Sequence, residues 1–206
     1  YTSRIVGGAD AVPNRYPYAV SLQHVDYLRH FCGGSLVAPD VVLIAAHCVK
    51  YFAANKIMVR TNPHRLYDPL EESSSSSSLS SEILLVQNVI RHPDYNPSRA
   101  GADPYDVALL TLQSNSTQPY VKLNTKSALP APGQTLTVMG LGTTVGDRES
   151  PPDVLQHTEV AAITNNECIE RSLSAPTSQP TPSPVFPLFP TSSTSPLPET
   201  SSSYPT

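Results

Sequence analysis

Short apolar runs separated by turn-forming residues limit the fold of this chain more than any other feature of its sequence. Between residues 5 and 113 the runs have the length of strands and are rich in Val, Ile and Leu, with Gly, Pro, Asn or Asp between them. The main ones are YAVSL (18–22), GSLV (34–37), VVLI (41–44), IMV (57–59), EILLVQNVI (82–90) and VALLTL (107–112). None keeps a 3.6-residue period over more than two turns, so the pattern predicts an all-β sandwich or barrel.

The remaining residues divide into a connector, a second unit and a tail. Residues 114–134 are polar and punctuated by proline, and apolar runs at 135–142 and 154–163 predict strands of a second unit. In the segment 171–206, 25 of 36 residues are Ser, Thr or Pro, and its prolines exclude a helix or a central strand. We therefore expect residues 171–206 to form a disordered tail.

Charge and hydropathy exclude two classes of partner. The net charge is −4 and no basic cluster occurs, whereas a nucleic-acid surface needs clustered Lys and Arg. No apolar run approaches the roughly 18 residues that a membrane-spanning helix requires. We expect neither a nucleic acid nor a membrane as a partner.

The stretch LIAAHC (43–48) places a histidine directly after an apolar run. Histidine suits a general base, because its pKa lies near neutrality. Asp106, just before the run VALL, is a candidate for the acid that orients this base, and Asp103 is a nearby competitor. Taken one at a time, His47 also fits a buried structural histidine and Asp106 a turn residue.

Six stretches of the sequence occur in the order seen in trypsin- and chymotrypsin-like serine proteases, which the chain resembles over residues 4–170. They are RIVGG (4–8), FCGGSLV (31–37), AAHC (45–48), YDVALL (105–110), GLGTT (140–144) and LQHTEVAAITNNEC (155–168). The resemblance implies an all-β, trypsin-like double β-barrel. It divides the chain into a propeptide remnant (1–4), a complete first barrel (5–113), a connector (114–134) and a truncated second barrel (135–170), ahead of the tail.

The resemblance also assigns roles to the two candidate residues. In a Ser-His-Asp triad the histidine takes the proton of the serine hydroxyl, while the aspartate holds the imidazole in one tautomer and stabilises its cation. His47 matches the general base and Asp106 the residue that orients it. The substrate would be the peptide bond of a protein or peptide, without a cofactor.

Three cysteines are present, at 32, 48 and 168. Cys32 and Cys48 match a disulfide of the family, which leaves Cys168 over. The alternatives are core thiols, or a metal site with His47, although two cysteines and one histidine at this spacing form no zinc motif. We expect a disulfide, no metal, and secretion into an oxidising compartment.

Arg4 and Ile5 resemble the activation junction of the family, where cleavage after the arginine frees a new amine. The implied partner is an activating trypsin-like protease, and we expect a monomer. The alternative is an ordinary strand start followed by a Gly-Gly turn.

The sequence contains no Gly-Asp-Ser-Gly-Gly run, which would carry the nucleophile in the family. GDRES (146–150) is a poor substitute, because it lacks a following glycine and lies too early. The chain departs from the family pattern just after Glu170, so we expect a serine endopeptidase that is truncated and inactive as written. The alternative is a non-catalytic secreted homologue that acts as a binding module.

Two weaker features concern modification and metal binding. Asn115, in the sequence Asn-Ser-Thr, is a candidate N-glycosylation site. Asp68, Glu71, Glu72 and Glu82 flank a serine run where some relatives bind calcium. The run makes a rigid oxygen cage implausible, and a solvated acidic loop is expected instead.

Overall fold

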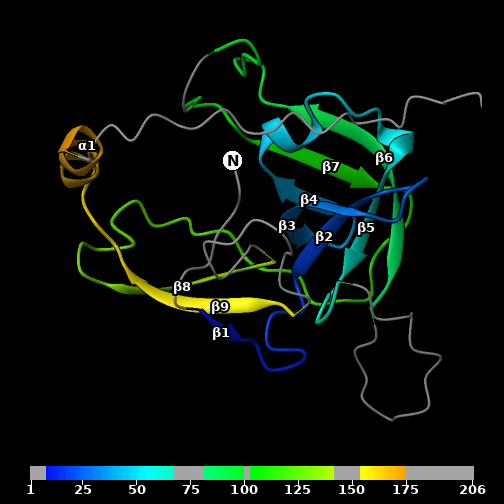
Figure 1. Cartoon of the computed structure of the whole chain (residues 1–206), viewed down its shortest axis with the longest axis horizontal. Helices are drawn as coiled ribbons and strands as arrows, with labels where there is room; N and C mark the ends of the chain where they lie inside the picture. Colours follow the sequence, from blue (N-terminus) through cyan, green and yellow to red (C-terminus); the bar gives the residue numbers. More distant parts are fainter. Residues whose placement is uncertain (1–7, 67–80, 100–102, 142–153, 175–206) are drawn as a thin grey trace, which may run out of the picture. The chain divides into compact units, whose positions relative to one another are not determined.

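The computed structural model describes residues 8–66, 81–99, 103–141 and 154–174 of the chain (Figure 1). It divides into two units, Tyr1–Thr164 and Asn165–Thr206. The expectations for Arg4, Ile5, the serine run and the tail from residue 175 lie outside the described residues.

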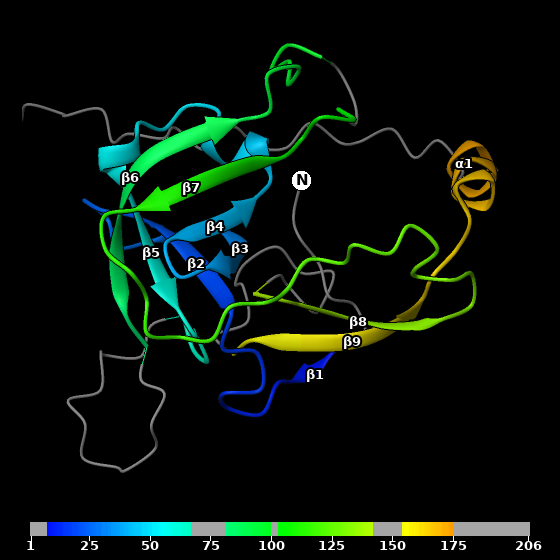
Figure 2. The ribbon, with the colours of Figure 1, turned by 180° about the vertical axis from the view of Figure 1, so that it is seen from behind.

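Six antiparallel strands of the first unit form a closed barrel in the order β2-β3-β4-β7-β6-β5. β2 pairs with both β3 and β5, which closes the ring. The strands are β2 (Ala19–His24), β3 (His30–Ala38), β4 (Val41–Ile44), β5 (Ile57–Thr61), β6 (Ile83–Arg91) and β7 (Ala108–Leu112). Each of them overlaps one of the apolar runs, which confirms the predicted all-β fold, and Figure 2 shows β6 and β7 side by side along one wall.

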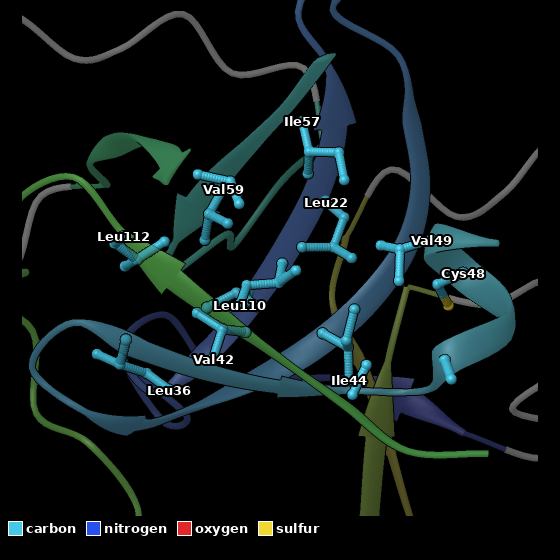
Figure 3. Packing of buried hydrophobic residues seen from close by; sticks show 14 residues of the cluster. Leu22, Leu36, Val42, Ile44, Cys48, Val49, Ile57, Val59, Leu110 and Leu112 are labelled. Atoms are coloured by element: carbon cyan, nitrogen blue, oxygen red, sulfur yellow. The ribbon is translucent and has the colours of Figure 1, made fainter. Parts of the chain in front are cut away.

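Alternating side chains of these strands fill the interior of the barrel. Figure 3 shows Leu22, Val42, Ile57 and Leu110 pointing toward one another, and each of these residues is fully buried. Because successive residues of a strand face opposite sides, the neighbours of these residues point outward. Burial of this apolar surface is the main force that closes the barrel.

Gly34 lies where β3 comes closest to its neighbours. A Cβ atom built at this position would lie 2.7 Å from Cγ2 of Ile44 and 2.9 Å from the carbonyl oxygen of Leu43. Both distances are below ordinary contact, and one of the two atoms belongs to the backbone. The close packing of β3 against β4 therefore requires glycine here.

A second sheet of the first unit has three strands in the order β1-β9-β8. β8 (Thr135–Gly140) and β9 (Gln156–Ala161) form a hairpin, as the apolar runs predict. β1 (Ala9–Asp10), which lies within the range 5–113 expected for the first barrel, pairs with β9. Strand pairing therefore joins two segments that are far apart in the sequence.

A small apolar cluster connects the second sheet to the rim of the barrel. Its buried members are Ala11, Tyr16, Ala19, Leu66, Leu141 and Leu155. The amide of Ala11 donates to the carbonyl of Leu155, and Tyr16 Oη lies 2.8 Å from Nδ1 of His157. Strands of the second sheet are therefore attached to the chain segment that enters β2.

The second unit is described as one helix, α1 (Asn165–Ser174). The sequence does not predict this helix, and its last four residues belong to the segment 171–206, for which we expected no regular structure. Cys168 lies in α1 and is exposed. Within the described residues, no helix combines the length and apolar character needed to cross a membrane.

Candidate active site

A short 3₁₀ turn after β4 delivers His47 to the surface. The turn, η1 (Ala46–Val49), begins after Ala45 in an extended conformation. Ala46 and Val49 are fully buried in the barrel core, whereas His47 between them is exposed. Two core anchors therefore fix the turn and hold the imidazole outside the barrel.

The register between β4 and β7 explains why an aspartate lies beside this histidine. Ile44, the last residue of β4, pairs with Ala108, the first residue of β7. His47 lies three residues after Ile44 and Asp106 lies two residues before Ala108. Antiparallel pairing thus places two residues that are 59 positions apart at the same end of the barrel.

Asp106 contacts His47 through both carboxylate oxygens. The amide of His47 donates to Oδ1 at 2.8 Å, and ring Nδ1 lies 2.6 Å from Oδ2. With an ionised carboxylate as acceptor, Nδ1 must carry the proton, so the lone pair of neutral imidazole lies on Nε2. Nε2 lies 3.7 Å from Sγ of Cys48, and the imidazole remains about half exposed.

The pKa of the Asp106 carboxyl lies below its ordinary value. Partial burial by itself would raise this pKa, because desolvation disfavours the charged form. Hydrogen bonds from the ring and the amide of His47, the nearby imidazole charge and the amide of Ala46 together outweigh that effect. Asp106 is therefore ionised and able to stabilise a cation on His47.

Asp103, the competing acid, has a different place. Its carboxylate accepts hydrogen bonds from the amides of Asn96 and Tyr105 and pairs with Arg99 at 3.2 Å. The pKa of the Asp103 carboxyl lies below its ordinary value, chiefly because the amide of Tyr105 donates a hydrogen bond to it. The amide of Asn96 and the charge of Arg99 lower the pKa further, and together these effects outweigh a small opposing effect of desolvation. Asp103 organises the loop ahead of β7, and Asp106 is the carboxylate that meets His47.

Cys32 and Cys48 form a disulfide, as predicted. The bond links β3 to η1 and lies directly beside the imidazole. Sγ of both cysteines and a ring nitrogen of His47 fall within 4.8 Å of one another, which is the spacing of a metal site. Because thiolates are the metal ligands and both sulfurs are bonded to each other, this cluster serves as a disulfide next to a base.

Three features near the barrel were missed by the sequence reasoning. The expectation of a solvated acidic loop is wrong for Glu82, whose carboxylate accepts hydrogen bonds from Ser116 and Thr117. His30 is partly buried beside Ser21, and Gly34 is enclosed by β4. No local pattern marks these residues, because each depends on a partner from another strand.

Comparisons with known proteins agree with the geometry. A sequence model of the trypsin family matches residues 5–181. A trypsin of Xenopus laevis is 32% identical over 165 residues, which are 80% of this chain and 61% of that protein. A tryptase of Mus musculus is 36% identical over 173 residues, covering 80% of this chain and 58% of its own length.

A similar solved structure is neuropsin, a serine protease of mouse brain. It superposes with a TM-score of 0.66 at 28% identity and covers 83% of this chain and 70% of its own. This chain spans about three fifths of the length of the curated relatives that it matches. With a family match over residues 5–181 and a barrel of the same fold, the chain belongs to the trypsin family of serine proteases.

Proposed function

We propose that the protein is a serine-type endopeptidase in which His47 is the general base and Asp106 orients it. The observation that carries this proposal is the two-point contact between Asp106 and His47, through the ring and through the backbone amide. Two hydrogen bonds to one carboxylate fix both the tautomer and the ring orientation. That is the arrangement that a base needs in order to take a proton from a serine hydroxyl.

His47 would act through Nε2, the ring nitrogen that faces away from Asp106. When Nε2 takes the proton of a serine hydroxyl, the imidazole becomes a cation, and Asp106 stabilises it at a distance of 2.6 Å. The proton then passes from Nε2 to the leaving amine of the cleaved peptide bond. The lowered pKa of Asp106 supports this role, because an ionised carboxylate is available to stabilise the cation on His47.

The 206-residue polypeptide itself is proposed to be inactive. The proposal rests on the lack of a Gly-Asp-Ser-Gly-Gly run in its sequence, because this run would carry the nucleophile and the glycines of the oxyanion hole in the family. Loss of the nucleophile from a triad lowers turnover on the order of a million-fold. We expect no acyl-enzyme with a fluorophosphonate probe; covalent labelling of this chain, absent after His47→Ala, would contradict the proposal.

The reading frame beyond Glu170 decides between the enzyme and the binding module. Sequencing of the mature transcript across the codons for Glu170 and Arg171 is the direct test. A frame that continues into a cysteine and a Gly-Asp-Ser-Gly-Gly run supports the peptidase. A transcript that encodes the Ser/Pro/Thr-rich segment favours the non-catalytic homologue.

The role of Asp106 can be tested on this chain without any turnover. In a proton NMR spectrum, the Nδ1 proton of His47 should appear far downfield, because it donates to a carboxylate at 2.6 Å. Asp106→Asn should remove this resonance, and Asp103→Asn should leave it in place. A downfield proton that survives Asp106→Asn would show that another group orients the ring.

The remaining proposals concern the substrates, oligomeric state, activation and secretion of the whole protein. Its substrates would be proteins or peptides, it would act as a monomer, and cleavage between Arg4 and Ile5 by a trypsin-like protease would activate it. Secretion is supported by the disulfide between Cys32 and Cys48, since such bonds persist in oxidising compartments. N-terminal sequencing of the mature protein would test the activation junction: any first residue other than Ile5 contradicts it.

A further inference from the structure

The carboxylate of Glu82 binds the two residues that follow Asn115. The Ser116 hydroxyl donates to Oε2 at 2.5 Å, and the amide of Thr117 donates to Oε1 at 3.1 Å. The hydroxyl of Thr117 also donates to Oε1. These contacts connect the start of β6 with the segment that leaves β7, across 35 residues of sequence.

The barrel holds both partners of this contact in place. The amide of Thr61 donates to the carbonyl of Glu82, and the amide of Glu82 donates to the hydroxyl of Thr61. On the other side, the amide of Ser116 donates to the carbonyl of Pro39. The contact therefore depends on the closed barrel, which brings β4, β5, β6 and β7 to this rim.

The charge of Glu82 strengthens the contact. Burial alone would raise the pKa of its carboxyl. The pKa is nevertheless lower than usual, because the carboxylate accepts hydrogen bonds from the hydroxyls of Ser116, Thr117 and Thr61 and from the amide of Thr117. An ionised carboxylate accepts stronger hydrogen bonds than a neutral group does. Ser116 is buried in this contact, whereas Asn115 is exposed.

Asn115, Ser116 and Thr117 form an acceptor sequence for an N-linked oligosaccharide. The acceptor motif demands a hydroxyl two residues after the asparagine, which means that the transferase uses that hydroxyl. A threonine hydroxyl has one proton to donate, and in the folded chain Thr117 donates it to Glu82. In the folded chain, Asn115 is therefore exposed, but the Thr117 hydroxyl that the transferase would recognise is engaged by Glu82.

We propose that Asn115 accepts an N-linked oligosaccharide only until the barrel closes, and that Glu82 then withdraws the acceptor sequence from the transferase. The donor is a lipid diphosphate-linked oligosaccharide. Nδ2 of Asn115 attacks the anomeric carbon, so that a C–N bond forms and the bond to the diphosphate oxygen breaks. The amide loses one proton and the lipid diphosphate leaves. Glu82 precedes Asn115 in the chain, so it is already present when the acceptor sequence emerges.

The test is translation of the full chain, behind an added secretory leader, in the presence of microsomes. The leader supplies entry to the lumen, so the outcome is independent of whether the protein is a secreted peptidase. Treatment with an N-glycosidase reports the modified fraction as a mobility shift. We expect the unaltered chain to be modified in part and Asn115→Gln not at all. A shift that persists in Asn115→Gln, or no shift in any chain, overturns the assignment of the acceptor.

Glu82→Ala should raise the ratio of modified to unmodified chain more than twofold, in line with the loss of charged hydrogen bonds. Ser116→Ala keeps the Asn-x-Thr motif, removes one donor to Glu82, and should raise the ratio less. Glu159→Ala, an exposed glutamate on β9, is the matched control and should leave the ratio unchanged. Equal ratios in all four chains, or complete modification of the unaltered chain, overturn the role of Glu82.

A second measurement separates release of Thr117 from general misfolding. Purified unmodified chain, folded and with its disulfide formed, is offered to the transferase and the lipid-linked donor. We expect transfer to the folded chain to be at least tenfold slower than transfer to the same chain after reduction and alkylation. This factor is on the order of the loss of one strong charged hydrogen bond. Equal rates for the two forms overturn the proposal, even if Glu82→Ala fails to fold.

Discussion

At the scale of single residues, the site depends on positions that the backbone dictates. His47 is exposed because Ala46 and Val49 on either side of it are buried in the core. Asp106 meets it because β4 and β7 pair in a register that joins Ile44 to Ala108. A residue far from the imidazole can therefore disturb the site if it shifts β4.

Gly34→Ala should lower the free energy of unfolding by about 2 kcal/mol, because the added methyl group overpacks the interior. It would press on Ile44, the last residue of β4, and on the carbonyl oxygen of Leu43. Urea denaturation measures the change. Gly33→Ala is the matched control, since its Cβ would lie 3.7 Å from the nearest atom, and it should change stability little. Equal losses in both variants would contradict the packing of β3 on β4.

His30 should make the fold sensitive to mild acid. Burial lowers its pKa from 6.5 to about 4, and Ser21 Oγ lies 2.8 Å from its Nδ1. Between these two pH values the unfolded chain binds a proton that the folded chain does not. The contribution of this residue to the free energy of unfolding is therefore fully present above pH 6.5. It falls by up to about 3 kcal/mol as the pH drops toward 4.

His30→Gln should remove this part of the pH dependence, because glutamine does not titrate. The measurement is the free energy of unfolding at pH 7, 5.5 and 4.5 for both chains. The difference between the chains should move in favour of the variant as the pH falls. A constant difference over this range would show that His30 is protonated equally in both states.

At the scale of elements, the disulfide joins β3 to the turn that carries His47. Cys32 lies in β3 and Cys48 in η1, at a sequence separation of 16. The covalent link and the paired strands β3 and β4 form a closed loop, which limits how far η1 can move away from the barrel. The position of the imidazole therefore depends on the bond as well as on the core.

Replacement of both Cys32 and Cys48 by serine should lower the free energy of unfolding by about 3 kcal/mol, the entropy estimate for a loop of this size. Thermal or urea denaturation under non-reducing conditions measures the loss. Cys168→Ser, at an exposed position of α1, is the control and should stay within about 0.5 kcal/mol. A similar loss in the control would mean that the thiol chemistry of Cys168, rather than the loop, governs stability.

At the scale of the whole molecule, two sheets of the first unit differ in how well they are buried. The barrel closes on itself and encloses a continuous apolar core. The sheet β1-β9-β8 has three strands, and Val138 and Val160 on its hairpin are more than two fifths exposed. Less apolar burial per residue means that this sheet opens at a lower free energy.

Native-state hydrogen exchange should separate the two sheets. Hydrogen-bonded amides in β2, β4 and β7 should exchange only through global unfolding. Those in β8 and β9 should exchange through local opening, whose free energy should be lower than that of global unfolding by about 2 kcal/mol or more. The same order should appear in limited proteolysis, with a protected fragment that contains the barrel. Equal exchange free energies, or a fragment that runs unbroken to residue 206, would contradict this order of stability.

The features of this protein that can be predicted from its sequence are local. Apolar runs with the period and composition of strands placed all six barrel strands and the hairpin, because a strand buries its residues in a pattern that single segments display. The motifs around His47, Asp106 and the cysteines pointed to the family and to the disulfide. Residues 165–174, by contrast, have the polar sequence NNECIERSLS, which does not predict the helix α1 that they form.

Contacts between residues that are distant in the sequence depend on the folded chain as a whole. The pairing of β1 with β9, the enclosure of Gly34, the burial of His30 and the contact of Glu82 with Ser116 and Thr117 join segments from 9 to 148 positions apart. The sequence alone already favours Asp106 over Asp103, and the register between β4 and β7 explains how Asp106 reaches His47. No local pattern carries this information, because strand register and side-chain contacts are settled by the closure of the barrel as a whole.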